Sequence, residues 1–333
     1  MSLQKSKRFS SEMKNPAISN REKFEMVKGK ISRFLFGFND RRGFVLKLLT
    51  YTLLISIGFV YLYPMLHMFV TSIKSLEDLL DMSIKWLPST IYTSNYAQAY
   101  SVMNIKEAFK GSLLLALLPT ICQVAVASLV GFGFARYHFP LKKLFFGLMI
   151  FSFIIPPQIL MMPMYRLLSA LELTGSINAF IVPALLGQGL NSTIFILIFY
   201  QFFKQTPETL YEAAEVDGAN QLTIFFRIAI PMAVPAFIVS FLFSFVWYWN
   251  ETYLTTLYLT SRSTDITTIL LQLQQFEQNY EAMYPVTANS PNKINEGIKM
   301  AGTVISILPL LIVYFFLQRY FVESVDKSGI TGE

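Results

Sequence analysis

Few side chains in this sequence are placed to carry out chemistry. It has two histidines, His67 and His138, and one cysteine, Cys122. The histidines lie far apart and lack acidic or sulfur partners at the spacing that a zinc site requires. No GxxxxGK[ST] phosphate loop and no GxSxG nucleophile turn occurs in the sequence. The pattern favours a protein that is not an enzyme, and any energy from ATP hydrolysis would have to come from another chain.

One polar segment has residue types that suit docking rather than catalysis. Residues 207–222 predict a short helix, a turn and the start of a second helix. Thr206 is placed to cap the first helix, Pro207 suits its first position, and Glu208 favours its dipole. Asp217 and Gly218 predict the turn, because glycine adopts backbone angles that other residues avoid.

The same segment combines small side chains with larger apolar ones. Ala213, Ala214, Gly218 and Ala219 would let another surface approach closely. We expect the segment to be held against neighbouring helices by its larger apolar side chains: Leu210, Leu222, Ile224 and Phe225. An ordinary amphipathic connector is the plain alternative to a docking surface.

The elements around this segment are long and apolar. The chain is 53% hydrophobic and 14% charged, whereas a soluble domain carries about 25% charged residues. Each apolar segment approaches or exceeds the roughly 20 residues that span a bilayer. We therefore expect an all-α polytopic membrane protein with six transmembrane segments: about Val45–Val70, Ser112–Ala135, Leu144–Met164, Ala179–Phe203, Ile228–Asn250 and Met300–Phe321.

Prolines interrupt most of these segments. In lipid such breaks are tolerated where neighbouring helices or cavities satisfy the freed backbone groups. The interruptions therefore favour a bundle around a path over a set of passive anchors. The prolines concerned are Pro64, Pro119, Pro156, Pro157, Pro183, Pro235 and Pro309.

Lys and Arg set the expected orientation in the cell membrane. They concentrate in the N-terminal tail, residues 1–43, which comes directly before the first membrane segment, residues 44–73. The positive-inside rule then predicts that this tail and the C-terminal tail, residues 322–333, are both cytoplasmic. Phe24, Val27, Ile31 and Phe34 have helical spacing among lysines, which predicts an interfacial helix on anionic lipid. A disordered basic tail is the alternative, and nothing here indicates nucleic-acid binding.

The remaining chain forms a core, residues 108–321, with a polar outer loop, residues 252–299. A helical stretch is expected within this loop around Ile266–Gln275, and residues 283–298 look like an insertion. The membrane segments contain almost no ionisable groups, whereas ion-coupled carriers place such groups within the membrane.

Neutral polar and aromatic side chains could line a path for an uncharged, hydroxyl-rich solute. Ordinary interhelical hydrogen bonds explain the amides equally well, and an interfacial aromatic belt explains the aromatic residues nearly as well. The candidates are Gln188, Asn191, Trp247, Tyr248, Trp249 and Asn250, with Gln123 as a further neutral polar residue.

The docking segment resembles the signature of ABC importer permeases. That signature is EAA, three residues, G, nine residues and I-x-L-P. Ile230 stands where the family usually has leucine. Similarity to the carbohydrate, maltose-permease-like branch extends over about Ala108–Phe321, supported by Met162–Tyr165, Phe243–Glu251 and Gln318–Glu323. The positions matching the signature are Glu212, Ala213, Ala214, Gly218, Ile228 and Pro231, with Asp217 beside the glycine.

This resemblance implies a type I importer permease fold with a cytoplasmic coupling helix that docks on an ATPase. It also implies a second homologous permease subunit, an ABC ATPase dimer that binds ATP and magnesium, and an extracellular solute-binding protein. The chain itself would need no cofactor, and its cargo would be a sugar. A same-family permease for a polyol or phosphorylated polyol, or less favourably a secondary carrier without an ATPase, is the alternative.

Overall fold

The computed structural model describes residues 28, 35, 37–38, 41–259, 266–285 and 294–329. It divides into two compact units, residues 1–67 and 68–333, which are described separately. The predicted interfacial helix depends on Phe24, Val27, Ile31 and Phe34, which lie outside the described residues.

The first unit contains a short hairpin and most of one long helix. Strands β1 (Gly37–Phe38) and β2 (Arg41–Arg42) pair antiparallel, with Gly37 opposite Arg42. Helix α2 (Phe44–Ser72) begins two residues later and runs on to the start of the second unit. At 1.5 Å per residue this helix is about 43 Å long, more than the hydrocarbon thickness of a bilayer.

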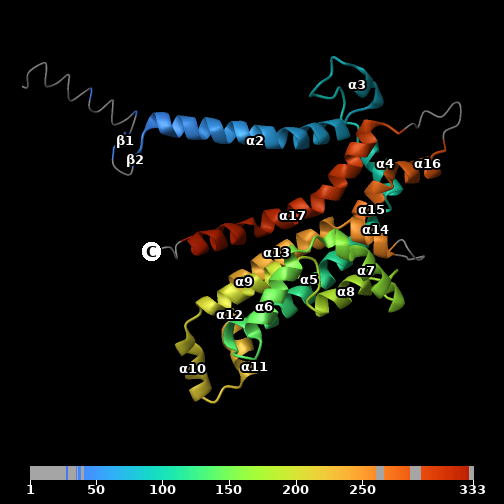
Figure 1. Ribbon diagram of the computed structural model, residues 1–333. Helices are drawn as coiled ribbons and strands as arrows, with labels where there is room; N and C mark the ends of the chain where they lie inside the picture. The colour runs from blue at the N-terminus through green and yellow to red at the C-terminus, as the bar shows by residue number, and fades with distance from the viewer. Residues whose placement is uncertain are drawn as a thin grey trace, which may run out of the picture. The chain divides into compact units, whose positions relative to one another are not determined.

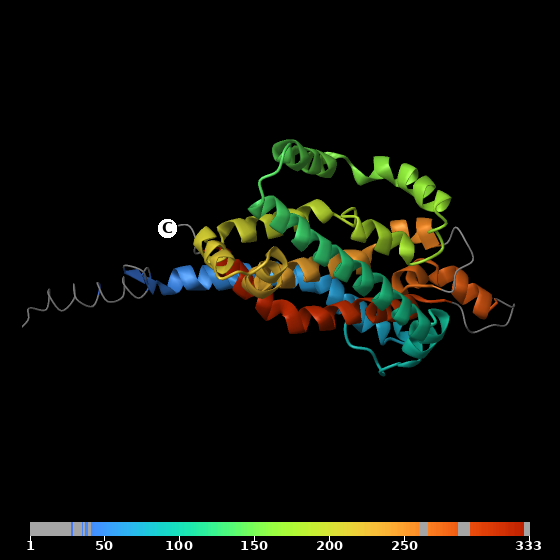
Figure 2. The same cartoon turned by 90° about the horizontal axis from the view of Figure 1, so that it is seen from below.

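Within the described residues of the second unit, the regular elements are all helices. Figure 1 shows α10 and α11 at one end of this unit, with α4, α15 and α16 at the other end. Helix α17 runs along the unit, and its C-terminal end points toward the end that holds α10, as Figure 2 also shows. The elements are α3 (Leu76–Leu80), α4 (Ser94–Val102), α5 (Ile105–Arg136), α6 (Lys142–Ile154), α7 (Pro157–Ala170), α8 (Asn178–Leu185), α9 (Ser192–Gln205), α10 (Glu208–Val216), α11 (Gln221–Ile224), a π-helix η1 (Phe225–Ala229), α12 (Ile230–Met232), α13 (Val234–Asn250), α14 (Tyr253–Leu259), α15 (Ile269–Gln274), α16 (Phe276–Met283) and α17 (Glu296–Gly329).

Three helices in the described residues are long and apolar enough to cross a membrane: α2, α5 and the Glu296–Phe316 part of α17. If each of two bent helix pairs is counted as one membrane span, the number of candidate spans in the described residues rises to as many as five. Helices α6 and α7 meet at 102°, and the run Gln221–Met232 meets α13 at 77°. The third and fifth predicted segments therefore correspond to bent helices rather than straight ones.

Proline explains the first bend. Ile155 and Pro156 have extended backbones, with ψ of 124° and 128°, between the end of α6 and the start of α7. A residue that precedes proline is driven out of the helical region by contact with the proline ring. Since Ile155 precedes Pro156 and Pro156 precedes Pro157, two successive residues leave the helix and the chain turns.

The fourth predicted segment differs more strongly from a single helix. Residues 179–203 form α8 and α9 with a break at residues 186–191. Gly187 (φ +73°) and Asn191 (φ +51°) have left-handed backbones inside the break. Glycine and asparagine adopt this conformation more readily than other residues, so the sequence disfavours a continuous helix there.

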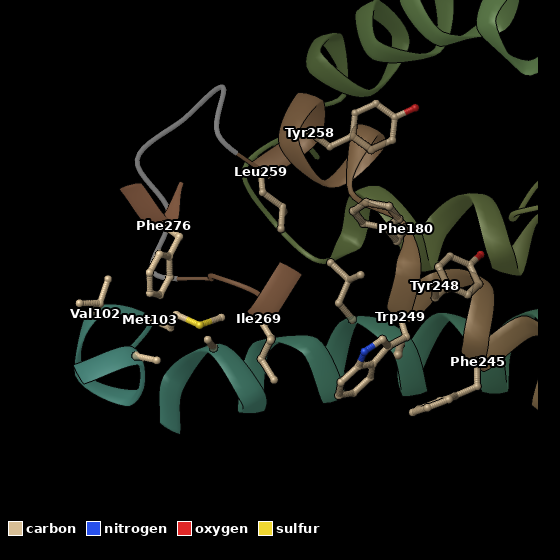
Figure 3. Packing of buried hydrophobic residues seen from close by; sticks show 14 of the residues in the cluster. Val102, Met103, Phe180, Phe245, Tyr248, Trp249, Tyr258, Leu259, Ile269 and Phe276 are labelled. Atoms are coloured by element: carbon tan, nitrogen blue, oxygen red, sulfur yellow. The ribbon is translucent and has the colours of Figure 1, made fainter. Parts of the chain in front are cut away.

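Helix α5 lies at the centre of the second unit and packs against α8, α9 and α13. Its close approach to α9 depends on Gly131, because a Cβ atom there would lie 2.7 Å from Phe199 Cβ and 2.9 Å from the Tyr200 nitrogen. Two buried apolar clusters flank this crossing. One joins α5 to α9, α10, α11 and α13. The other joins α5 to α4, α8 and α13–α17, and Figure 3 shows part of it.

Candidate coupling element and solute site

Helix α10 begins at Glu208, and Pro207 rather than Thr206 occupies its N-cap position. The predicted capping role of Thr206 is wrong: its hydroxyl donates to the Phe202 carbonyl at 3.3 Å. Thr206 therefore ends α9, and no side chain caps the start of α10. The physical reason is that Thr206 and Pro207 are both extended, with ψ of 128° and 132°, which separates the two helices.

The turn after α10 forms at the predicted glycine. Gly218 has φ +82°, and the Ala219 N–H donates to the Ala214 carbonyl at 2.9 Å. This 6→1 hydrogen bond is the mark of a Schellman motif, in which glycine takes the left-handed position. Asn220 then caps α11, because its side-chain oxygen accepts from the Thr223 N–H at 2.8 Å.

One face of α10 is open to solvent. Glu212, Ala213, Asp217 and Gly218 are exposed, and Ala214 is half-buried. A Cβ atom built on Gly218 would meet nothing within 4 Å. Small side chains thus border an open surface together with the exposed carboxylates of Glu212 and Asp217, which suits docking of another protein.

The anchors of this element differ from those that the sequence predicts. Ile224 and Phe225 are buried, but Leu210 and Leu222 are 41% and 66% exposed. Tyr211, which sequence reasoning missed, is fully buried at 0% exposure and joins the cluster around α5 and α9. The sequence did contain a signal for this anchor: Tyr211 is the lone aromatic residue of α10. It follows Glu208 by one helical turn, so the two residues face the same side of the helix.

The last two signature positions lie on the helical run that follows α11. Ile228 is half-buried in η1, and Pro231 is exposed in α12. Both residues therefore lie in the run Gln221–Met232, which leads to the bend before α13, and not on α10.

A small cavity lies at the break between α8 and α9. Its volume of about 50 Å³ holds a few water molecules and is well below the roughly 300 Å³ of a small ligand pocket. In this conformation it does not hold a sugar ring. Its lining is mostly apolar with a few polar groups: Met164, Ala179, Phe180, Pro183, Gln188, Gly189, Leu190, Tyr248, Leu254 and Tyr258.

A closed hydrogen-bond network forms one wall of the cavity. The Tyr248 hydroxyl donates to Gln123 Oε1 at 2.7 Å and accepts from the Leu190 N–H at 3.2 Å. The Gln123 amide donates to the Leu190 carbonyl at 2.6 Å. Gly189 makes room for this arrangement, since a Cβ atom there would lie 2.6 Å from the Tyr248 hydroxyl. The network ties the break to α5 and α13, and buried polar groups need such partners in an apolar interior.

The structure brings only some of the predicted path residues to this cavity. Tyr248 and Gln188 line it. The Trp247 ring packs on Phe195, with centroids 5.2 Å apart. Trp249 is 6% exposed, with its ring next to the ribbon of α5 in Figure 3.

The two remaining amides stay at the surface. Asn250 is exposed, and its side chain donates to the Val246 carbonyl at 2.9 Å. Asn191 is exposed within the break and keeps its left-handed backbone. Neither residue lines the cavity. Gln123, which the sequence marked only as a neutral polar residue in an apolar segment, instead proves central to the cavity wall.

Electrostatics around the cavity favour neutral groups. Burial, with a smaller effect from the Glu251 carboxylate, raises the pKa of Tyr258 to about 12, so this phenol stays protonated at physiological pH. Among the residues that the structure describes, no three His, Cys, Asp or Glu side chains gather as a metal site would require. The chemistry available here is hydrogen bonding and apolar contact.

The fold defines the class of protein. It matches the crystal structure of a bacterial ABC transporter involved in the import of the acidic polysaccharide alginate, with a TM-score of 0.70 at 21% identity. The match covers 85% of this chain and 99% of that chain. The fold is therefore that of a type I ABC importer permease.

The family follows from the sequence comparison. The chain belongs to the binding-protein-dependent transport system inner membrane components, whose family model matches residues 123–327. It is therefore a multi-pass membrane protein, and the predicted resemblance to carbohydrate ABC importer permeases is confirmed.

Two relatives illustrate the range of the family. The arabinooligosaccharides transport system permease protein AraQ of Halalkalibacterium halodurans is 27% identical over 279 residues, covering 83% of this chain and 93% of AraQ. The osmoprotective compounds uptake permease protein GgtD of Synechocystis is 29% identical over 299 residues, covering 88% of this chain and 95% of GgtD.

Proposed function

We propose that this chain is the permease subunit of an ATP-driven, binding-protein-dependent importer of an oligosaccharide. The observation that carries the proposal is the open face of α10, where Glu212, Ala213 and Gly218 are exposed beside a left-handed glycine turn. A surface of small side chains at the end of a helical bundle suits close docking by a separate protein. The resemblance of residues 212–231 to the family signature is our reason for proposing an ABC ATPase as that protein.

In this proposal α10 is the cytoplasmic coupling helix. ATP and magnesium bind to the ATPase dimer, whose closure displaces α10 and shifts the bundle between inward-facing and outward-facing states. Such a change is a two-state equilibrium that binding elsewhere biases. The placement of the C-terminal end of α17 toward the α10 end (Figure 1) supports a cytoplasmic C-terminal tail.

The cavity supports an uncharged cargo. Its polar groups are neutral, and the Tyr248, Phe180 and Tyr258 rings line it. Amides and aromatic rings suit hydroxyl-rich sugars, and the similarity to AraQ favours an oligosaccharide. Because about 50 Å³ is too small for a sugar, the cavity would have to widen during transport, as alternating access requires.

The partners that we propose are a second, homologous permease, two ATPase subunits and an extracellular solute-binding protein, and membership of the binding-protein-dependent family supports this set. The test is purification of the chain with its co-purifying subunits, followed by reconstitution in liposomes with the binding protein. We expect uptake of labelled arabinooligosaccharide only with ATP. Uptake driven by an ion gradient without ATP, or a purified complex without an ATPase on α10, would overturn the proposal.

A second cargo class has one specific observation in its favour. GgtD, named for osmoprotective compounds, is as similar to this chain as the oligosaccharide relative. Competition of unlabelled polyol-type osmoprotectants against labelled oligosaccharide in the same liposomes separates the two. Competition by the small solute alone would assign the second class.

A further inference from the structure

Side chains fasten α10 to the last turn of α5. Glu208 and Tyr211 are one helical turn apart on α10, so they face the same way. Both meet Arg136: the guanidinium lies 3.5 Å from the Glu208 carboxylate and 4.1 Å from the centre of the Tyr211 ring. The Arg136 side chain is only 16% exposed, whereas that of Glu208 is 69% exposed. The ring contact is therefore the better protected of the two.

The ring of Tyr211, rather than its hydroxyl, makes this joint. The ring is fully buried and also meets Phe132 of α5, with centroids 6.2 Å apart. Among the described residues the hydroxyl has no hydrogen-bond partner. A guanidinium over a desolvated aromatic face is attracted by the ring's electron density, and its flat shape stacks there as an ammonium does not.

A second tether joins the same two helices. The Tyr137 hydroxyl, next to Arg136, donates to Gln221 Oε1 at 2.8 Å. The Gln221 amide in turn donates to Glu215 of α10 at 2.9 Å. Burial, and then the Glu215 charge, raises the pKa of Tyr137, so this phenol remains a proton donor. The end of α5 is thus fixed to α10 on both sides of Tyr211.

The main chain on either side of α10 is poorly suited to transmit a push. Thr206 and Pro207 are extended before the helix, and Gly218 turns the chain after it. Extended and glycine residues connect helices without continuing their hydrogen bonds, so they absorb changes of angle as hinges do. A displacement of α10 therefore reaches the bundle through side chains more directly than through its covalent ends.

Helix α5 continues from this joint to the cavity. Arg136 and Gln123 are thirteen residues apart in one helix, a distance of about 20 Å. Proline occurs in α5 only at Pro119, beyond Gln123, so the stretch between the two sites is uninterrupted. Gln123 holds both Tyr248 and the Leu190 backbone at the cavity wall. One rigid helix therefore contacts the coupling helix at one end and the cavity at its middle.

We propose that Arg136 and Tyr211 form the joint through which displacement of α10 moves α5, and that α5 in turn moves the Gln123–Tyr248–Leu190 wall of the cavity. This inference rests on the proposed function and names the residues that connect its two sites. Arg136 and Tyr211 are positioning residues, which touch neither ATP nor cargo.

The test compares ring removal with ring retention in the reconstituted complex. Tyr211→Ala removes the stacking surface, Tyr211→Phe retains it, and Arg136→Lys keeps a charge for Glu208 but loses the flat guanidinium. Three quantities are measured: co-purification with the ATPase, ATP hydrolysis stimulated by the cargo-loaded binding protein, and cargo imported per ATP. Lys204→Ala is the matched control, because Lys204 lies 5.6 Å from the Tyr200 ring and so forms a cation–ring pair within α9 that includes no residue of α10.

We expect Tyr211→Ala and Arg136→Lys to assemble with the ATPase but to lower cargo imported per ATP by about tenfold, within the usual range of coupling between sites. Tyr211→Phe should restore the wild-type ratio, and Lys204→Ala should keep it. If the two residues act as one joint, combining Tyr211→Ala with Arg136→Lys should cost no more than either alone.

Three results would overturn the inference. The first is a wild-type ratio of cargo imported per ATP for Tyr211→Ala, and the second is an equal loss in that ratio for the Lys204→Ala control. The third is loss of ATPase co-purification with Tyr211→Ala, which would assign Tyr211 to assembly. Failure of the proposed function would appear differently, because the wild-type complex itself would then show no ATP-dependent uptake.

Discussion

Gly218 offers a sharp test of the proposed docking surface, because its backbone requirement and its surroundings can be separated by mutation. Its φ of +82° is unfavourable for other residues, and forcing an ordinary L-residue into this region costs about 1–2 kcal/mol. Asparagine tolerates the left-handed backbone better and still adds a side chain. Gly218→Asn therefore adds bulk with little strain, whereas Gly218→Val adds both bulk and strain.

The magnitudes decide what each variant can show. A strain of about 1–2 kcal/mol is small beside the roughly 5–15 kcal/mol of a typical domain, so both variants should fold and insert. Within this chain the added Cβ atom meets nothing within 4 Å, so the chain itself supplies no clash. A large loss of transport in both variants therefore has to come from a partner that approaches Gly218 closely.

The assay is ATP-dependent uptake in liposomes, normalised to the amount of inserted permease. We expect both Gly218→Asn and Gly218→Val to lower uptake by about tenfold or more, which corresponds to at least about 1.4 kcal/mol of lost docking. Glu212→Lys should act in the same direction, because it reverses the charge on the same exposed face. Wild-type uptake from Gly218→Val at normal insertion would refute the docking role. Normal uptake from Gly218→Asn together with low uptake from Gly218→Val would show that the glycine is needed only for its left-handed backbone.

Three further predictions concern the framework. Gly131→Ala should destabilise the permease by about 1–3 kcal/mol, because the new Cβ would lie 2.7 Å from the side chain of α9; thermal unfolding in detergent measures this, and an unchanged midpoint would contradict the packing. Tyr248→Phe should cost about 1–3 kcal/mol, because the Gln123 side-chain oxygen loses its buried donor; a double variant of Tyr248→Phe and Gln123→Ala that loses no more stability than either single variant would show one shared network, and additive losses in the double variant would not. The Ser89 hydroxyl holds the pKa of Asp78 below its ordinary value, so the stability from this carboxylate is present above the ordinary pKa and disappears as the pH falls through the lowered one; Asp78→Asn should reduce this loss between neutral and acidic pH, and equal acid sensitivity of both proteins would contradict it.

Much of the fold was predictable because local sequence dictates it. The apolar segments at residues 45–70, 112–135 and 300–321 lie within α2, α5 and α17, since long runs of apolar side chains form helices in lipid whatever their neighbours. The turn after α10 was predictable for a similar reason, because Gly218 is suited to a left-handed backbone.

The wrong predictions concern side chains that could cap either of two neighbouring helices, or that could face either the bundle or the solvent. Thr206 suits the start of α10 by type, yet it ends α9, and the sequence alone does not say which helix it belongs to. Leu210 and Tyr211 are neighbours, and the pattern did not indicate which of them faces the bundle. Packing against Phe132 and Arg136 selects Tyr211.

The sequence by itself determined the class of protein: helices apolar enough for a membrane, few ionisable groups within them, and a signature at residues 212–231. Those properties depend on residue type and on spacing along one chain. Only the tertiary structure decided which residues work together, because Gln123, Leu190 and Tyr248, or Arg136 and Tyr211, are far apart in sequence and meet only once α5 has packed against α9, α10 and α13. Such contacts depend on how whole helices pack across one another, and a local sequence pattern does not determine that packing.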